Sequence, residues 1–315
     1  MHWSTPSLSR RRFLAVSGVC LACAIHGEAA DETPEPIIDI HQHTGYSGRT
    51  DKQLLAHQRS MGITHTILLP AGRPVDRPST HGGKSNGLAA QCGGNDAVME
   101  MARRHPGEFR FFANEVADLP EAVATIEQYL KQGALGIGEQ KFAVDCDSES
   151  IRALAELAAE YQVPILMHFQ HETYNTGIER FHEILEKFSK TNFIGHAQTW
   201  WGNIDARHDQ KIMYPPGPVT PGGITDRLLG DYPNMFGDLS AGSGLNALQR
   251  DEDFTRDFLR RHQDKLLYGS DCNDLFGRGP GCQGSQTLAT VRRLAPSHEI
   301  ERKIFYGNAK RLLRI

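Results

Sequence analysis

The sequence carries no excess of charge of one sign and no long hydrophobic run near its start. Its 315 residues include 38 acidic and 34 basic side chains, which gives a formal net charge of −4. No broad basic surface is therefore available to collect nucleic-acid phosphates, and we expect no nucleic-acid partner. The apolar run at residues 15–25 is far shorter than the roughly 20 residues that a transmembrane helix needs. We predict no stable membrane span once a leader has been removed.

Cysteine pairs with the CxxC spacing of structural zinc sites are absent beyond residue 30. Four cysteines remain there, Cys92, Cys146, Cys272 and Cys282. The last two could close a short loop as a disulfide, but spacing alone does not decide pairing, and a chain of this size does not need the link. The hydrophobic content of 39% is ordinary for a globular protein and is enough to bury a core.

Residues 1–30 resemble a twin-arginine export signal. Three arginines at positions 10–12 precede the apolar run at 15–25, and small residues follow up to Ala30. We therefore expect cleavage near Ala30 and an exported mature domain, residues 31–315, in the periplasm or outside the cell. The partner for that step is the twin-arginine export machinery, which carries folded proteins and so suits a metal loaded in the cytoplasm. An arginine-rich N-terminus that stays in the cytosol is the alternative.

After the leader, short apolar runs alternate with longer amphipathic stretches. The runs that we interpret as buried strands are residues 36–40, 64–69, 109–113, 134–138, 164–167, 192–195, 235–239 and 265–268. Between them, residues 148–161 are expected to form a helix with Ser148 as its N-cap. Eight strands separated by helices predict an α/β fold, either a closed (β/α)8 barrel of the TIM type or a doubly wound sheet.

The spacing of polar residues favours the barrel. Glu139 and His168 are 29 residues apart, and His168 and His196 are 28 apart, so a polar side chain ends successive units at nearly the same point. In a barrel the C-terminal ends of all strands meet at one mouth. Two longer segments, 71–94 and 198–220, follow strands and are expected to cover that mouth as specificity loops. Trp200 and Trp201 in the second segment either stack on a substrate or pack within the loop.

Five side chains at strand ends have the chemistry of a metal site. His41 and His43 lie two residues apart in a strand and therefore point to the same side. His168, His196 and Asp271 each follow an apolar strand. Imidazole and carboxylate are the ligands expected for zinc or another first-row divalent metal that keeps positions open for water. Asp39 either orients a ligand histidine or is a polar residue at a strand start.

Several segments together resemble the amidohydrolase superfamily, within it the amidohydrolase-related branch of hydrolases, lactonases and decarboxylases. The segments, in the order of that family, are IDIHQH, PILMHF, FIGHA, FGDLS, LLYGSD and KIFYGNAKRLL. The resemblance implies that His41, His43 and His168 bind metal and that His196 binds a second metal or acts on substrate. It also implies that Asp271 binds metal and shuttles a proton.

The fourth strand departs from the branch. Relatives with a bridging carboxylated lysine carry Lys at its end and nuclease-like relatives carry Glu, whereas this chain has Gly138-Glu139-Gln140-Lys141. Glu139 is the better bridging candidate, because it directly follows the apolar strand. A single-metal site in which Glu139 pairs with Lys141 stays open, so the cofactor is expected to be one or two divalent ions, zinc first.

The leading hypothesis is a metal-dependent hydrolase that attacks an amide, ester, lactone or related bond of a small carbonyl compound with metal-activated water. The first alternative is a non-oxidative decarboxylase. Such relatives often carry an acidic residue shortly after the histidine that matches His196, and here none occurs before Asp205. The second alternative is a non-catalytic exported barrel that binds a metal or ligand. Exposed helices also make a homo-oligomer an expectation.

Overall fold

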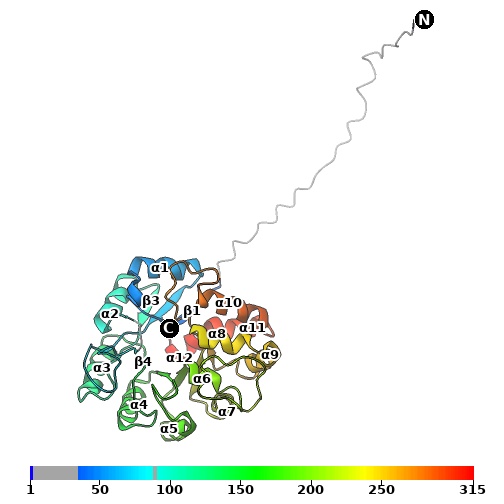
Figure 1. Ribbon diagram of the computed structural model, residues 1–315. Coiled ribbons are helices and arrows are strands. Elements are labelled where there is room, and N and C mark those ends of the chain that lie inside the picture. Colours follow the sequence, from blue (N-terminus) through cyan, green and yellow to red (C-terminus); the bar gives the residue numbers. More distant parts are fainter. Residues whose placement is uncertain (3–34, 88–90) are drawn as a thin grey trace. The chain divides into compact units, whose positions relative to one another are not determined.

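The computed structural model describes residues 1–2, 35–87 and 91–315 (Figure 1). Residues 3–30 of the expected leader therefore lie outside the described residues. Glu35–Ile315 form one compact unit. Among the described residues, no helix is both long enough and apolar enough to cross a membrane.

Eight parallel strands form the centre of this unit. They are β1 (Ile38–Gln42), β2 (His65–Leu68), β3 (Phe109–Phe111), β4 (Ile137–Gln140), β5 (Ile165–His168), β6 (Phe193–His196), β7 (Met235–Asp238) and β8 (Leu266–Leu267). Strands β1 to β3 pair in order, as do β4 to β8. Ala113 pairs with Ile137 between the two groups, and the Ile40 amide donates to the Tyr268 carbonyl at 3.1 Å. These contacts close the ring, so the predicted (β/α)8 barrel is confirmed.

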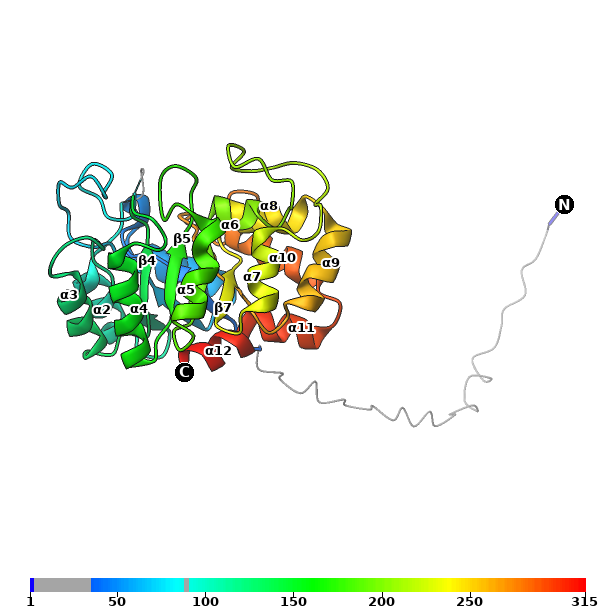
Figure 2. The same cartoon turned by 90° about the horizontal axis from the view of Figure 1, so that it is seen from below.

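Helices surround the strands on the outside, except the last helix, which lies across the end of the barrel opposite the long loops (Figures 1 and 2). They are α1 (Asp51–Ser60), α2 (Asn95–Arg104), α3 (Ala122–Leu130), α4 (Glu149–Tyr161), α5 (Phe181–Lys187), α6 (Gln198–Gly202), α7 (Ile224–Asp231), α8 (Ala241–Gln249), α9 (Glu252–Arg261), α10 (Gln283–Leu294), α11 (His298–Arg302) and α12 (Asn308–Leu313). The hydroxyl of Ser148 accepts from the Ile151 amide at 3.5 Å, so the N-cap expected for α4 is confirmed.

Apolar side chains fill the inside of the barrel and leave only one end for chemistry. Ile40, Leu166 and Leu267 point inward and are buried together with side chains of the other strands. Leu312 and Leu313 of α12 pack against this cluster. Figure 2 shows α12 on the side opposite the long loops that follow the strands. The C-terminal ends of the strands are thus the open mouth.

The strands at the mouth run further than their apolar segments predict. β1 covers Ile38–Gln42 rather than 36–40, and β4 covers Ile137–Gln140 rather than 134–138. The last residues of both strands are polar but buried, because Gln42 donates to the Ser270 hydroxyl at 2.7 Å and Gln140 donates to Oδ1 of Asn114 at 2.6 Å. Hydrophobicity ends before the strand does, so a pattern based on it places the boundary too early.

Candidate metal centre

The six side chains that the sequence singles out as site residues lie together at the mouth. They come from β1, β4, β5 and β6 and from the turn after β8. The structure brings together His41, His43, Glu139, His168, His196 and Asp271. Their donor atoms form three overlapping groups, and within each group all donor atoms lie within 4.8 Å of one another.

The first set of contacts joins the two histidines of β1 to both carboxylates. The Nε2 atoms of His41 and His43 are 3.2 Å apart. They lie 3.5 and 3.7 Å from Oε2 of Glu139. Oδ1 of Asp271 lies 3.8 Å from His41 Nε2 and 3.5 Å from His43 Nε2. Two imidazoles and two carboxylate oxygens therefore face one small volume.

The second set of contacts uses the other oxygen of each carboxylate. Oε1 of Glu139 lies 2.5 Å from Nδ1 of His168 and 3.8 Å from Nε2 of His196. Oδ2 of Asp271 lies 3.6 Å from Nε2 of His196. Each carboxylate thus directs one oxygen to His41 and His43, whereas the other oxygen of Glu139 reaches both His168 and His196 and that of Asp271 reaches His196 alone.

Asp238, the last residue of β7, orients two of these imidazoles. Its Oδ2 lies 2.7 Å from Nδ1 of His41 and 3.1 Å from Nδ1 of His196. Burial alone would raise its pKa, but His41 and His196 lower the pKa of Asp238 well below its usual value. The ionised carboxylate accepts a hydrogen bond from each Nδ1–H group, so both Nε2 atoms face the mouth. The Ser240 hydroxyl donates to the same oxygen at 2.7 Å.

The sequence pointed to Asp39, and not to Asp238, as a residue that could orient a ligand histidine. In the structure Asp238 has that position. Asp39 accepts from the Ser270 and His41 backbone amides at 2.9 and 3.0 Å and from Nε2 of Gln58 at 2.9 Å. It therefore holds β1 to the chain after β8 and to α1, and it contacts no imidazole. One feature of the sequence could have pointed to Asp238: it ends an apolar strand, as His168 and His196 do.

The hydrogen bonds leave nitrogen lone pairs facing each other. Nδ1–H of His41 donates a hydrogen bond to Asp238, and Nδ1–H of His43 donates one to the Leu69 carbonyl at 2.7 Å. Both Nε2 atoms then present lone pairs across only 3.2 Å. That arrangement is repulsive unless a proton or a cation lies between them. The donors fit a bound cation.

The two carboxyl groups and the imidazole of His168 are in the protonation states that metal ligands need. Burial opposes ionisation of Glu139, but Lys141 and His168 lower its pKa well below the usual value. Burial also opposes ionisation of Asp271, but the β1 histidines lower its pKa to about 2. Burial and the nearby Lys141 lower the pKa of His168 to about 4, so this imidazole is neutral.

In the part of the chain that the structure describes, the carboxylates at the mouth form no ion pair within 4.0 Å with a Lys or Arg, and Lys141 acts on Glu139 only from a longer distance. The carboxylates of Glu139, Asp238 and Asp271 pair within 4.0 Å only with histidines, so Glu139 does not pair with Lys141. Oδ1 of Asp271 is buried and accepts no hydrogen bond. Several carboxylates so close together are costly to bury without a cation. Nitrogen and oxygen donors of this kind suit zinc or another first-row divalent ion.

The two long loops differ in what they offer a substrate. In the first segment, Gly72, Lys84, Asn86 and Cys92 are among the residues that line a cavity of about 690 Å³, which Gly45, two residues after His43, also lines. In the second segment, Trp200 and Trp201 are buried, with exposed fractions of 0% and 2%. Nε1 of Trp201 donates to the Asp238 carbonyl at 2.8 Å. The hypothesis that these two rings stack on substrate is wrong, because they pack beneath the mouth.

Comparison with known proteins supports the fold. No family model matches the sequence, and no curated protein matches it. An uncharacterised TIM-barrel protein from Bordetella bronchiseptica is 16% identical, with a TM-score of 0.59 over 89% of this chain and 98% of that one. A candidate 2-pyrone-4,6-dicarboxylic acid hydrolase from Pseudomonas putida is 16% identical, with a TM-score of 0.58 over 90% and 98% of the two chains.

Structural neighbours also include amidohydrolases and decarboxylases. A 5-carboxyvanillate decarboxylase from Novosphingobium aromaticivorans, solved with manganese bound, is 13% identical. Its TM-score is 0.50 over 84% of this chain and 80% of that one. At these identities the likeness shows the shared barrel and does not decide the reaction.

Proposed function

We propose that this chain is a metal-dependent hydrolase of the amidohydrolase superfamily, acting on an amide, ester, lactone or related bond of a small carbonyl compound. The observation that carries the proposal is the way Glu139 and Asp271 divide their oxygens between two groups of histidines. His41 and His43 would hold one divalent ion, zinc first, and His168 and His196 would hold a second, with Glu139 able to donate an oxygen to each group.

The chemistry follows from the residues at the mouth. When bound, the ions supply Lewis acidity, which activates a water molecule and polarises a substrate carbonyl. Asp271 is placed to carry the proton, because its Oδ1 has no hydrogen-bond partner and its side chain is 13% exposed. It takes the proton from the attacking water and returns it to the leaving group. Nε2 of His196, 3.6 Å from Oδ2 of Asp271, faces the same volume. It would hold the second ion or, in a site with one ion, would be protonated and donate to the substrate oxygen.

A decarboxylase is the second candidate, because decarboxylases occur among the structural neighbours. The first acidic residue after His196, Asp205, lies away from the mouth chemistry. Its carboxylate pairs with Arg250 at 2.8 Å and accepts from the Arg207 and Thr220 amides at 2.9 and 3.2 Å. Because Asp205 is bound by Arg250 and by loop amides, it does not serve as the acidic partner expected near His196 in a decarboxylase. Hydrolysis is therefore the function that the geometry supports best.

The test combines metal content with one substitution. We expect Asp271→Asn to lower the turnover of amide, ester or lactone substrates at least about 100-fold, since it removes the proton carrier. Asp231→Asn, at the exposed end of α7, is the matched control and should keep full activity. Activity of Asp271→Asn within tenfold of the parent would refute the shuttle role. Release of carbon dioxide from aromatic carboxylates, without hydrolysis, would instead favour the decarboxylase.

Metal stoichiometry tests the bridged pair. Inductively coupled plasma mass spectrometry should find about two fewer ions per chain in a His41→Ala, His43→Ala double variant than in the parent. A difference of one would indicate a single-metal site with Glu139 outside it. No difference would overturn the metal-water mechanism.

We also propose that residues 1–30 direct twin-arginine export and that the mature domain works in the periplasm or outside the cell. The support is the order of basic, apolar and small residues in the sequence. Replacing Arg10 and Arg11 by lysine keeps the charge and should trap the full chain in the cytoplasm. Equal export of the variant and the parent in cell fractionation would contradict this.

A further inference from the structure

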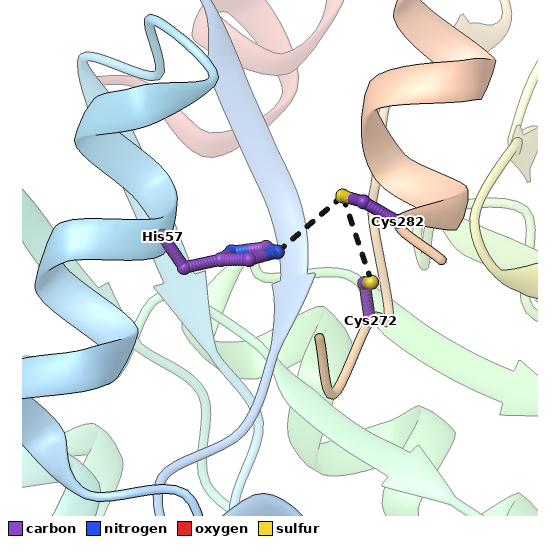
Figure 3. Close-up of side chains that lie close together, drawn as sticks. All are labelled: His57, Cys272 and Cys282. Carbon is purple, nitrogen blue, oxygen red and sulfur yellow. Dashed lines mark hydrogen bonds between the residues drawn. The ribbon is translucent and has the colours of Figure 1, made fainter. Parts of the chain in front are cut away.

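A second cluster of metal-binding side chains lies outside the barrel mouth (Figure 3). His57 extends from α1, Cys272 follows Asp271 in the chain after β8, and Cys282 is the N-cap of α10. All three are buried, with exposed fractions of at most 2%. The two cysteines belong to the core between the strands and the helices. Three segments far apart in sequence thus place one nitrogen and two sulfur atoms together.

The two sulfurs are not joined to each other. Sγ of Cys272 and Sγ of Cys282 are 3.8 Å apart, whereas a disulfide needs about 2.05 Å. Both cysteines are free thiols in the structure. The loop-closing disulfide that the sequence left open is therefore not formed here.

Two of the three distances in the cluster match the edges of a tetrahedral zinc site, and the third, between a His57 nitrogen and Sγ of Cys272, is at most 4.8 Å. With Zn–S bonds of about 2.3 Å and Zn–N bonds of about 2.0–2.1 Å, tetrahedral angles place two sulfurs about 3.8 Å apart and a sulfur and a nitrogen about 3.5 Å apart. The sulfurs of Cys272 and Cys282 lie 3.8 Å apart. Sγ of Cys282 and Nε2 of His57 are separated by 3.5 Å. One ion can therefore contact both thiolates and the imidazole with little rearrangement.

The surroundings supply a further donor and support the thiolate of α10. Oδ2 of Asp274 lies 4.0 Å from Nε2 of His57, and the Phe276 and Gly277 amides donate to that oxygen at 2.8 and 2.7 Å. The Ser285 amide donates to Sγ of Cys282 at 3.4 Å, in the first turn of α10. A sulfur at a helix N-terminus is favoured as the thiolate, which is the form that binds metal.

We propose that His57, Cys272 and Cys282 bind a structural zinc ion, with Asp274 or water as the fourth ligand. Two thiolates and an imidazole select zinc over magnesium, calcium or manganese. The ion ties α1 and the start of α10 to the segment that follows Asp271. This site is separate from the centre at the mouth, where the donors are imidazoles and carboxylates, so it does not depend on the proposed hydrolase activity.

Cobalt(II) substitution of the folded protein tests the site. Thiolate ligands give intense near-ultraviolet charge-transfer absorption to cobalt, whereas imidazole and carboxylate ligands do not. We expect this band in the parent and in the His41→Ala, His43→Ala double variant, and its loss in Cys282→Ala. Cys146→Ala, which removes another fully buried thiol, and Cys92→Ala should both retain it. Absence of the band in the parent, or its survival in Cys282→Ala, would overturn the proposal.

A measurement on the unaltered chain covers the case in which Cys282→Ala does not fold. Reaction of the thiols with a mercurial reagent should release one zinc ion per chain as Cys272 and Cys282 are modified, detected with a chelating dye. Removing zinc first with a chelator should make two more thiols reactive. Zinc release that does not follow modification of these thiols, or a Cys272–Cys282 disulfide found by mass spectrometry of the isolated protein, would refute the site.

Discussion

At the scale of single residues, replacing Asp238 tests how much the orientation of His41 and His196 contributes to metal binding, since Asp238 itself is not an expected metal ligand. It accepts hydrogen bonds from His41 and His196 and contacts no substrate in the mechanism above. Asp238→Asn keeps the shape but loses the charge that fixes both imidazoles. We expect metal affinity at the mouth to fall about 10–100-fold, measured by competition with a chelating dye.

Asp39→Asn is the control for this substitution, because Asp39 is equally buried but bonds to backbone amides, Ser270 and Gln58 rather than to an imidazole. It should lower the free energy of unfolding while leaving metal affinity within about threefold of the parent. Equal losses of affinity in the two variants would mean that Asp238 acts only through general stability.

Which site residues could be predicted depends on how local their signal is. His41 and His43 share one strand, and His168 and His196 each end an apolar run, so their positions follow from short segments. Asp238 ends such a run as well, but an aspartate there is equally an ordinary polar strand end. Only closure of the barrel brings it beside His41, 197 residues away in the chain. Its role depends on that contact, which no local pattern contains.

At the scale of elements, the packing of α6 on β6 explains a glycine in the segment FIGHA. A Cβ atom on Gly195 would lie 2.3 Å from the ring of Trp200, far inside van der Waals contact. Trp200 is held against Phe169, with ring centroids 5.9 Å apart, and cannot easily withdraw. We expect Gly195→Ala to lower the free energy of unfolding by about 1–3 kcal/mol in urea denaturation.

Gly107→Ala is the control for Gly195→Ala. No atom lies within 4 Å of the methyl group added at Gly107, and the backbone there is not left-handed. It should change the free energy of unfolding by less than about 0.5 kcal/mol. If Gly195→Ala were as mild, Trp200 would have room to move, and the packing beneath the mouth would be looser than the structure indicates.

At the scale of the whole molecule, the sequence predicted the barrel because Glu139, His168 and His196 follow one another at intervals of 29 and 28 positions at strand ends. The same periodicity placed the long loops after the correct strands. It could not predict whether Trp200 and Trp201 face a substrate or the core, since a loop carries no hydrophobic period. Nor could it place His57 beside Cys272 and Cys282, because that contact joins α1 to the segment after β8 and to the start of α10.

Metal binding at the mouth should release protons, because the metal-free site holds them. Burial lowers the pKa of His43, but the neighbouring Cys92 and Asp271 outweigh it and raise the pKa to about 10. At neutral pH this imidazole is therefore protonated in the metal-free protein, whereas a metal ligand must be neutral. Binding has to displace that proton, so the apparent affinity should rise with pH up to about 10 and level off above it.

Calorimetry of zinc binding in two buffers with different ionisation enthalpies measures this release directly. We expect at least about one proton to be released per chain near pH 7 and progressively fewer as the pH approaches 10. His182→Gln, on the exposed face of α5, should leave the number unchanged. Release near zero across this range would show that the mouth holds no displaceable proton, and the 3.2 Å approach of the two Nε2 atoms of His41 and His43 would then need another explanation.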